Sequence, residues 1–291
     1  MMPIMRRLTL SLLVALVLGA CSHGQTTTQT TQSVSASPAA LPVTSPTAPP
    51  PSPSPSPTPA FSDLDGVANA SLIDQLAQLQ VLWPPSGPFF PGKPILRREF
   101  VRWLMHADAA IWAIDPSKQI RPALTGSKAF FRDVPVTDPD FGAIEGMHDA
   151  GIAIGFPDKS FKPDRPITRE EALAIKAYVD CGAPDPMLAD DLAQAYYELP
   201  TWRDKHAISH AYVAAIASCL LQDQGTTGVS TLDTIGRTFG AIVALDPRRP
   251  LNRAEAAAMI WKIGEQKPDL NNFPPRSAAD ALGPSPTPQP T

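Results

Sequence analysis

The sequence lacks most features that mark enzymes and nucleic-acid-binding proteins. Basic side chains are in the minority, since 24 Lys and Arg stand against 28 Asp and Glu for a formal net charge of −4. Nonspecific nucleic-acid binding depends on cations that neutralise phosphates, so an acidic chain is a poor candidate for it. A glycine-rich phosphate loop is missing, and Ser209 beside His210 lacks the glycines of a nucleophile elbow. We therefore expect no enzymatic activity, no cofactor and no nucleic-acid partner.

Two further patterns could indicate site chemistry, but neither has support around it. Asp138-Pro139-Asp140 and Asp190-Asp191 are carboxylate pairs, and isolated pairs are more typical of turns and helix caps than of acids and bases. His206 and His210 are four residues apart, a spacing that can hold zinc on a helix. Because no third ligand is obvious, we interpret them as a solvated helix face and expect no metal.

No apolar run is long enough to suggest a membrane-spanning helix. The N-terminal run from Leu8 to Leu18 has eleven residues, whereas a bilayer core needs about 20. Arg6 and Arg7 precede it, and this order is typical of an export signal. The run ends in Leu18-Gly19-Ala20-Cys21, which resembles the lipobox of bacterial lipoproteins.

That resemblance implies a signal peptide over residues 1–20 and a diacylglycerol on the Cys21 thiol. The chain would then lie outside the cytoplasm, held to a membrane of the cell envelope through lipid. Ser22, not Asp, follows the cysteine, which favours the outer membrane in a cell with two membranes. The alternative is an ordinary signal peptide cut elsewhere, with Cys21 incidental.

Charged side chains are absent from residues 21–60, which are dominated by Thr, Ser, Gln and Pro. Such a segment cannot bury enough apolar area to offset its conformational entropy, so we expect a disordered stalk. Fully extended, it would reach on the order of 120 Å at about 3.1 Å per residue. Residues 268–291 repeat the Pro, Ser and Thr bias, and we expect a disordered tail there. The folded body is then 61–267, which is ample for a core.

Cysteine is rare, with three residues in the chain. If Cys21 carries lipid, Cys181 and Cys219 remain. They could pair in an oxidising compartment, or they could be two small buried residues. The sequence does not decide between these two interpretations.

One segment recurs three times, with an apolar residue, two prolines, an apolar residue, an arginine and a glutamate at matched offsets. The copies are Phe89–Glu99, Phe161–Glu171 and Leu245–Glu255. In the second and third copies, Thr168 and Asn252 are followed three residues later by glutamate, which predicts a helix start with a capping box. Leu96 occupies that position in the first copy, so we expect its helix to begin less cleanly.

An amphipathic stretch precedes each recurring segment. Apolar residues at helical spacing mark its face in each case: Leu72, Leu76, Leu79 and Trp83; Phe141, Ile144, Met147 and Gly151; Ile208, Tyr212, Ala215 and Cys219. These spacings predict helices. Each repeat is therefore expected to be helix, loop, capped helix, and three such pairs should pack into one all-α body because one pair cannot bury its apolar stripe alone.

The repeats resemble the S-layer homology family. The second copy is the clearest, with Phe131-Arg132-Asp133, then Gly155-Phe156-Pro157-Asp158, then Ile167–Glu171. The first opens with Phe61-Ser62-Asp63, and the third can be started at Trp202-Arg203-Asp204. The resemblance implies a pseudo-threefold helical bundle with repeats at 61–115, 130–182 and 202–267. About seventeen extra residues around 223–243 form a loop insertion in the third.

The resemblance also implies grooves between repeats that bind cell-wall polysaccharide, often with a pyruvyl ketal. Its signature arginine corresponds to Arg97, Arg169 and Arg253, and its loop to Gly155 and Asp158; Trp83 could offer a surface for sugar stacking. An arginine at a helix N-terminus, where backbone N–H groups are exposed, suits a carboxylate. The alternative is that these arginines only pair with nearby glutamates on the surface.

Two functions remain open at this level. The first is a lipid-anchored, non-enzymatic tether to cell-wall glycan. The second is an envelope assembly or sensing factor whose repeats have lost glycan binding and dock a protein partner, as the altered loops of the first and third repeats suggest. An enzyme with wall-binding repeats is disfavoured because the body leaves no room for a catalytic domain.

Overall fold

The computed structural model describes residues 60–153, 155–184, 186–198, 202–222, 230–264 and 275–284. The expected signal peptide, the lipid-bearing Cys21 and nearly all of the stalk lie outside these residues. The described part consists of helices with a single two-stranded sheet, so the predicted all-α class is confirmed. Within it, no helix combines the length and the apolar character that a bilayer crossing requires.

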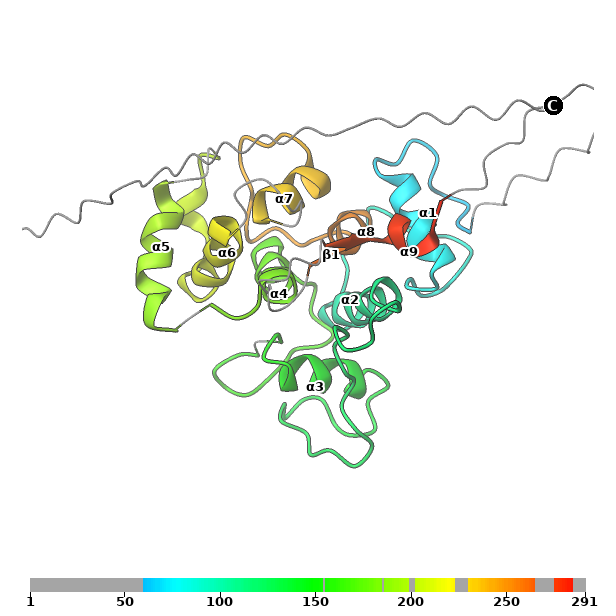
Figure 1. Ribbon diagram of the computed structural model, residues 1–291, viewed down its shortest axis with the longest axis horizontal. Coiled ribbons are helices and arrows are strands. Elements are labelled where there is room, and N and C mark those ends of the chain that lie inside the picture. Colours follow the sequence, from blue (N-terminus) through cyan, green and yellow to red (C-terminus); the bar gives the residue numbers. More distant parts are fainter. Residues whose placement is uncertain are drawn as a thin grey trace, which may run out of the picture. The chain divides into compact units, whose positions relative to one another are not determined.

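Three similar helix pairs form the framework. The first pair is α1 (Ala70–Gln78) and α2 (Arg97–Ile111), the second is α3 (Phe141–Asp149) and α4 (Arg169–Cys181), and the third is α6 (His210–Gln222) and α8 (Arg253–Ile260). The second helices α2, α4 and α8 lie together at the centre, with α1, α3 and α6 outside them (Figure 1). Each outer helix packs on the central helix of the preceding pair: α3 on α2, α6 on α4, and α1 on α8.

A ring of backbone hydrogen bonds joins the three pairs where the central helices begin. The N–H of Ile95 donates to Leu251 O at 3.0 Å, that of Leu251 to Ile167 O at 2.9 Å, and that of Ile167 to Ile95 O at 3.1 Å. All three side chains are fully buried. The apolar residue of the recurring segment therefore lies on a pseudo-threefold axis.

The aspartates of the three expected opening motifs have the same local role. Asp63, Asp133 and Asp204 each accept backbone N–H bonds from two consecutive residues, at 2.6 to 2.8 Å. In each case the second donor has a left-handed backbone, with φ of 56° at Phe90, 57° at Lys162 and 50° at Asp246. The sharp turn before each recurring proline is thus held by an aspartate some 26 to 41 residues upstream.

Several helix boundaries differ from the sequence prediction. Helix α1 ends at Gln78, and a left-handed turn at Gln80 (φ 58°) follows, so Trp83 lies in the loop beyond it. Gly151, with φ 74°, lies beyond the end of α3, and Ile208 precedes the start of α6. Of these three residues, Ile208 is buried and Trp83 is 61 % exposed, so the apolar spacing alone did not mark the helix ends.

Two helices are additions to the three pairs. Helix α5 (Ala189–Glu198) follows a short 3₁₀ turn at Pro186–Leu188 and packs on α6. Helix α7 (Thr231–Phe239) lies in the expected loop insertion and packs on α8. A second 3₁₀ turn, Lys205–Ala207, precedes α6. The described part of the insertion therefore contains a helix. Ser230 caps it by accepting from the Asp233 N–H.

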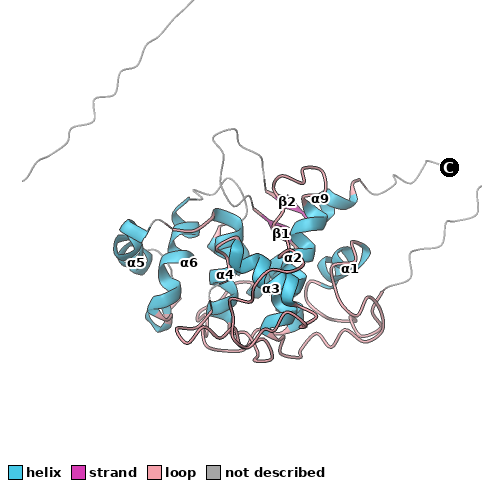
Figure 2. Cartoon of the chain, turned by 90° about the horizontal axis from the view of Figure 1, so that it is seen from below, coloured by secondary structure: helices cyan, strands magenta, loops and turns pink. Residues whose placement is uncertain are grey.

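The prediction of a disordered C-terminal tail is wrong for residues 275–284. Strand β2 (Arg276–Ser277) pairs antiparallel with β1 (Lys262–Ile263), and α9 (Ala278–Leu282) follows. Figure 2 shows this sheet and α9 beside α2. The Arg276 Nε donates to Ile111 O at 3.2 Å, and Ala278 is fully buried. The tail was predicted to be disordered from its Pro and Ser content, but Ser277 and Asp280 form a capping box that begins a short helix.

Cys181 and Cys219 form a disulfide with a Cα–Cα distance of 5.4 Å. It joins α4 and α6 near their C-terminal ends, within the interface where these two helices pack on each other. Of the two interpretations left open by the sequence, pairing is therefore confirmed.

Candidate functional site

The three signature arginines each begin a central helix and reach into the next helix pair. Their exposed fractions are 2 % for Arg97 and 5 % for both Arg169 and Arg253. The prediction that they begin helices is confirmed. The alternative interpretation, pairing with glutamates on the surface, is right about the partners and wrong about the place. The arginines pair with glutamates, but they are buried and each pair joins two neighbouring helix pairs.

At the junction of the first and second pairs, Arg97 is fixed from several directions. Its Nε donates to Phe161 O at 2.9 Å, and its Nη1 lies 3.3 Å from the Glu171 carboxylate. Its guanidinium also lies 4.7 Å from the centre of the Phe161 ring, within cation–π range. Burial lowers the pKa of Arg97, although the Glu171 charge opposes this.

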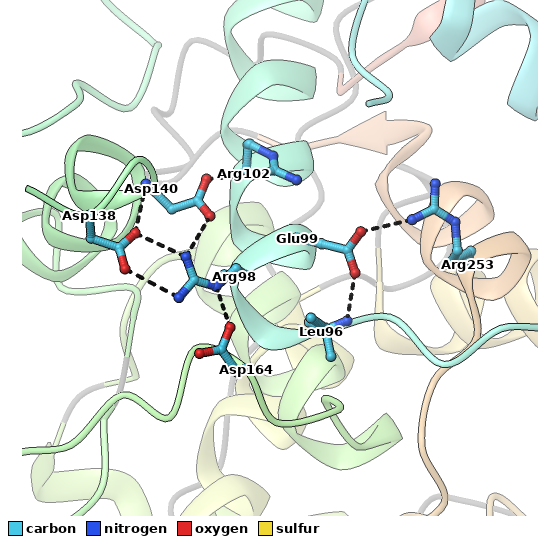
Figure 3. Close-up of polar contacts among 8 residues, drawn as sticks. All are labelled: Leu96, Arg98, Glu99, Arg102, Asp138, Asp140, Asp164 and Arg253. Carbon is cyan, nitrogen blue, oxygen red and sulfur yellow. Dashed lines mark hydrogen bonds and ion pairs between the residues drawn. The ribbon is translucent and has the colours of Figure 1, made fainter. Parts of the chain in front are cut away.

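The other two junctions repeat this arrangement. Arg169 donates to Leu245 O at 2.7 Å and to the Glu255 carboxylate at 2.7 Å. Arg253 donates to Phe89 O at 2.7 Å. It also donates to the Glu99 carboxylate at 2.9 Å (Figure 3). Each glutamate also accepts the backbone N–H of its own cap residue, at 3.0 to 3.2 Å. A capping glutamate therefore serves two purposes, closing its own helix start and holding the arginine of the preceding pair.

The helix N-termini do not offer free backbone donors, which corrects the sequence-based argument for anion binding there. The N–H groups of Arg97 and Arg98 donate to Arg165 O and Pro163 O at 2.9 and 3.1 Å. The matching donors of α4 and α8 bond to the loops of the third and first copies in the same way. The loop of each neighbouring segment thus satisfies the first turn, which also explains why α2 begins at Arg97 without a side-chain cap at Leu96.

A second cation lies at each junction and is more accessible than the signature arginine. These residues are Lys93, Arg165 and Arg249, at the same offset in the three recurring segments. Arg165 pairs with Glu171 and its side chain is 37 % exposed, while Arg249 lies 4.0 Å from Glu255 and is 54 % exposed. The sequence analysis missed them, although their fixed place before the second proline was a usable signal.

Aromatic rings lie beside basic side chains at these junctions. The Phe156 ring centre is 4.0 Å from Lys162 Nζ and 5.2 Å from the Arg165 guanidinium carbon. At the next junction the Phe239 ring lies 4.2 Å from the Arg169 guanidinium. Phe239 ends α7, so the insertion supplies the ring at that junction. Phe156 was named only as part of the loop motif Gly155-Phe156-Pro157-Asp158, and Phe239 was not singled out because it lies in the unmatched insertion.

A cavity of about 460 Å³ opens at the junction of the second and third pairs. Arg169, Arg249 and Glu255 contribute its charged wall, and Phe239 contributes an aromatic wall. Its remaining lining comes from the segment before α1, the end of α7 with the segment that follows it, and the start of α8: Val67, Ala68, Asn69, Thr238, Ile242, Ala244, Asp246, Asn252 and Ala254. This junction therefore has a concave surface of the size of a small ligand site.

The other expected site residues lie in loops. Trp83 is 61 % exposed, and its carbonyl accepts from Arg253 at 3.4 Å, so it lies at the junction of the third and first pairs. Gly155 packs so closely that a Cβ atom there would lie 2.3 Å from the Phe131 ring, which gives this glycine a packing role. Asp158 accepts from the Ser160 hydroxyl and N–H, and these bonds lower its pKa to about 2. Direct glycan contact by these residues stays a prediction.

The carboxylate pair Asp138 and Asp140 is engaged in ion pairs. Arg98 contacts Asp138, Asp140 and Asp164 at 2.8 to 3.2 Å (Figure 3). Asp140 also pairs with Arg102 at 2.8 Å. This network fastens α2 to the start of α3, which agrees with a structural interpretation of the pair.

Comparison with known families identifies one match. Residues 130–173 match the S-layer homology domain. The matched stretch contains Asp133, Gly155, Arg169 and Glu171, whose contacts are described above. No match among curated proteins was found. An S-layer homology domain is therefore present in the second helix pair, and such a domain indicates association with the cell surface.

Proposed function

We propose that this protein is a lipid-anchored, non-enzymatic tether that binds cell-wall polysaccharide at the junctions between three S-layer homology repeats. The proposal rests on one observation above all. At the junction of the first and second pairs, the accessible Arg165 lies beside the Phe156 ring, and the buried Arg97–Glu171 pair supports both. At the next junction, the exposed Arg249 and the Phe239 ring line one cavity.

This arrangement suits an acidic sugar. Arg165 and Lys162 present charge to solvent around the Phe156 ring, so a carboxylate such as a pyruvyl ketal could bind the cations while a sugar face packs on the ring. Arg97 is occupied by Glu171 and Phe161 O. We therefore assign the signature arginines a positioning role and assign direct contact to the second cations.

The rest of the chain fits a tether. Lipid at Cys21 would hold one end in a membrane, the outer one in a cell with two membranes, and residues 21–60 would span the gap to the wall. Several weak sites on one body raise apparent affinity for a polymer without any single tight contact. Each individual groove can therefore be modest in affinity.

The test is retention of the full-length protein on purified cell-wall sacculi. We expect wild type to be retained and the double variant Lys162→Gln/Arg165→Gln to lose roughly 10-fold or more in affinity, because charge-assisted hydrogen bonds contribute about 1.5–3 kcal/mol each. Arg121→Gln is the matched control, since Arg121 is exposed in the connection between the first two pairs. Circular dichroism of each variant checks the fold.

Absence of wild-type retention would overturn the proposal, as would equal retention of the double variant and the control. Retention lost equally in all charge variants would indicate nonspecific attraction to an anionic wall. If wild type fails on sacculi and instead co-purifies with an envelope protein, the repeats dock protein and the assembly or sensing function replaces the tether.

A further inference from the structure

A charged pair that takes no part in the junctions is buried in the interior. Lys176 and Asp180 lie one turn apart on the same face of α4, and each side chain is 1 % exposed. The Lys176 Nζ contacts both carboxylate oxygens of Asp180. The Gly264 N–H donates to Asp180 Oδ1 at 2.9 Å. An amine and a carboxyl group are thus held together by secondary structure alone.

The surroundings of this pair exclude water. The small space beside it is too narrow for a water molecule and is lined by apolar and hydroxyl groups from α4, α6 and α7: Leu173, Ala177, Cys219, Thr231 and Thr234. Two opposite charges in such a place carry a desolvation penalty of several kcal/mol per ion, which their attraction offsets only in part. The neutral form of the pair is therefore less disfavoured here than it is in water.

The protonation states point the same way. Burial lowers the pKa of Lys176 to about 8 and raises the pKa of Asp180. Asp108 on α2, which interacts electrostatically with both, has its pKa raised by burial to about 7. Arg237 adds positive charge that further disfavours the ammonium form. A desolvated, uncharged lysine is a nucleophile.

We propose that Lys176 and Asp180 condense to an intramolecular amide that cross-links one turn of α4. Rotation about the Cβ–Cγ bond of Asp180 turns the face of the carboxylic acid toward the amine. The Nζ lone pair attacks Cγ, the C–N bond forms, and the C–OH bond breaks. The hydroxyl leaves with one amine proton as water, so no oxidant or other reactant is required, and the water leaves the interior during local opening of the helices packed on α4.

The structure supplies the elements that this step needs. Contact through one helical turn provides proximity, which can replace most of the entropy of a bimolecular reaction. The Gly264 N–H is a donor for the oxygen that becomes negative during attack. After condensation that oxygen is an amide carbonyl and still accepts from Gly264, while both buried charges have disappeared. The product is better suited to this interior than the starting pair.

Peptide mapping of the full-length protein tests the proposal. The purified protein is held at pH 8, then denatured, reduced, alkylated and digested with trypsin. We expect a peptide spanning Glu170–Arg203 that is uncut after Lys176 and lighter than the sequence mass by one water molecule. Fragmentation should place the loss between Lys176 and Asp180.

Three results would each overturn the cross-link. The first is cleavage after Lys176 that gives two peptides of ordinary mass. The second is an uncut peptide of full mass, which is a missed cleavage. The third is a water loss in a peptide still cut at Lys176, which is the signature of an aspartyl succinimide. The Lys176→Arg variant is the control, since it keeps the charge, cannot form the Lys–Asp amide and should be cut at this position. Binding to sacculi plays no part in this readout. Failure of the cross-link proposal and failure of the proposed function can therefore be distinguished.

Discussion

At the scale of single residues, exposure separates two sets of basic groups that the sequence does not distinguish. The signature arginines are 2 to 5 % exposed and have carbonyl and carboxylate partners from the next helix pair. The second cations Arg165 and Arg249 are 37 and 54 % exposed. The first set therefore contributes mainly to stability, and the second set is available to a ligand.

The contrast between Arg97 and Arg165 gives a direct test, because both pair with Glu171. Breaking a buried pair costs about 3–5 kcal/mol, whereas a half-exposed pair contributes about 0–1 kcal/mol. We expect Arg97→Gln to lower the free energy of unfolding in urea by several kcal/mol and Arg165→Gln to change it little. Equal losses in the two variants would contradict the assigned roles.

The chemistry of the site was only partly predictable from the sequence, for a reason visible at these residues. The recurring Arg and Glu correctly marked the junctions and the helix starts. Their burial could not be read from the pattern, because it depends on loops that come from the neighbouring repeat. Phe239 was hidden for a related reason: it enters a junction from an insertion that has no counterpart in the other copies.

At the scale of elements, α4 and α6 are fastened to each other at both ends. Near their N-termini, Glu170 accepts from the Ser209 N–H and hydroxyl, each at 2.8 Å, and Tyr212 donates to Glu171 at 3.4 Å. At their C-termini lies the Cys181–Cys219 disulfide. The disulfide thus supports the interface that also holds Glu171 in place.

Removal of this disulfide should destabilise the body without unfolding it. The crosslink closes a loop with a sequence separation of 38 residues, for which chain entropy gives about 4 kcal/mol at most. We expect the double variant Cys181→Ala/Cys219→Ala to melt at a lower temperature than the oxidised wild type. Reductant should lower the wild-type melting temperature toward that of the variant and leave the variant unchanged. A wild type that is insensitive to reductant would contradict this.

Local rules predicted some elements well and missed others. The caps at Thr168 and Asn252 placed the starts of α4 and α8 correctly because side chain and backbone satisfy each other within four residues. Helix α1 was extended too far, to Trp83, because apolar spacing does not show a left-handed turn at Gln80. Helix α9 was missed because it packs on α1 and α2, more than 150 residues earlier in the chain, and because Arg276 before it donates to Ile111 O.

At the scale of the whole body, the three helix pairs form a closed ring and not an open stack. The Arg97–Glu171, Arg169–Glu255 and Arg253–Glu99 pairs run in one direction and return to the start. The backbone bonds among Ile95, Ile167 and Leu251 close in the same way. The third helix pair is therefore joined to the first by the same kinds of ion pair and backbone hydrogen bond that join helix pairs adjacent in sequence.

Closure changes what deletion should do. In a linear array, stability is approximately a sum over repeats and nearest-neighbour interfaces, so the loss of a terminal repeat leaves the others folded. Here, truncation after residue 200 removes two of the three junctions and leaves the buried Arg169 without Leu245 O and the Glu255 carboxylate. It also uncovers α1, which packs on α8, and removes the carbonyl that Ile95 donates to.

We therefore expect the truncated chain to lose cooperative unfolding in urea and to show little near-ultraviolet circular dichroism, while the full body unfolds in one transition. The control is a chain truncated after residue 264, which lacks β2 and α9 but keeps all three junctions; it should stay cooperative with reduced stability. A two-pair chain that unfolds cooperatively, with a stability near two thirds of the whole, would show that the ring is energetically a linear stack. The difference matters for the proposed function, because in a closed ring damage to one junction would loosen the candidate binding surfaces at the other two.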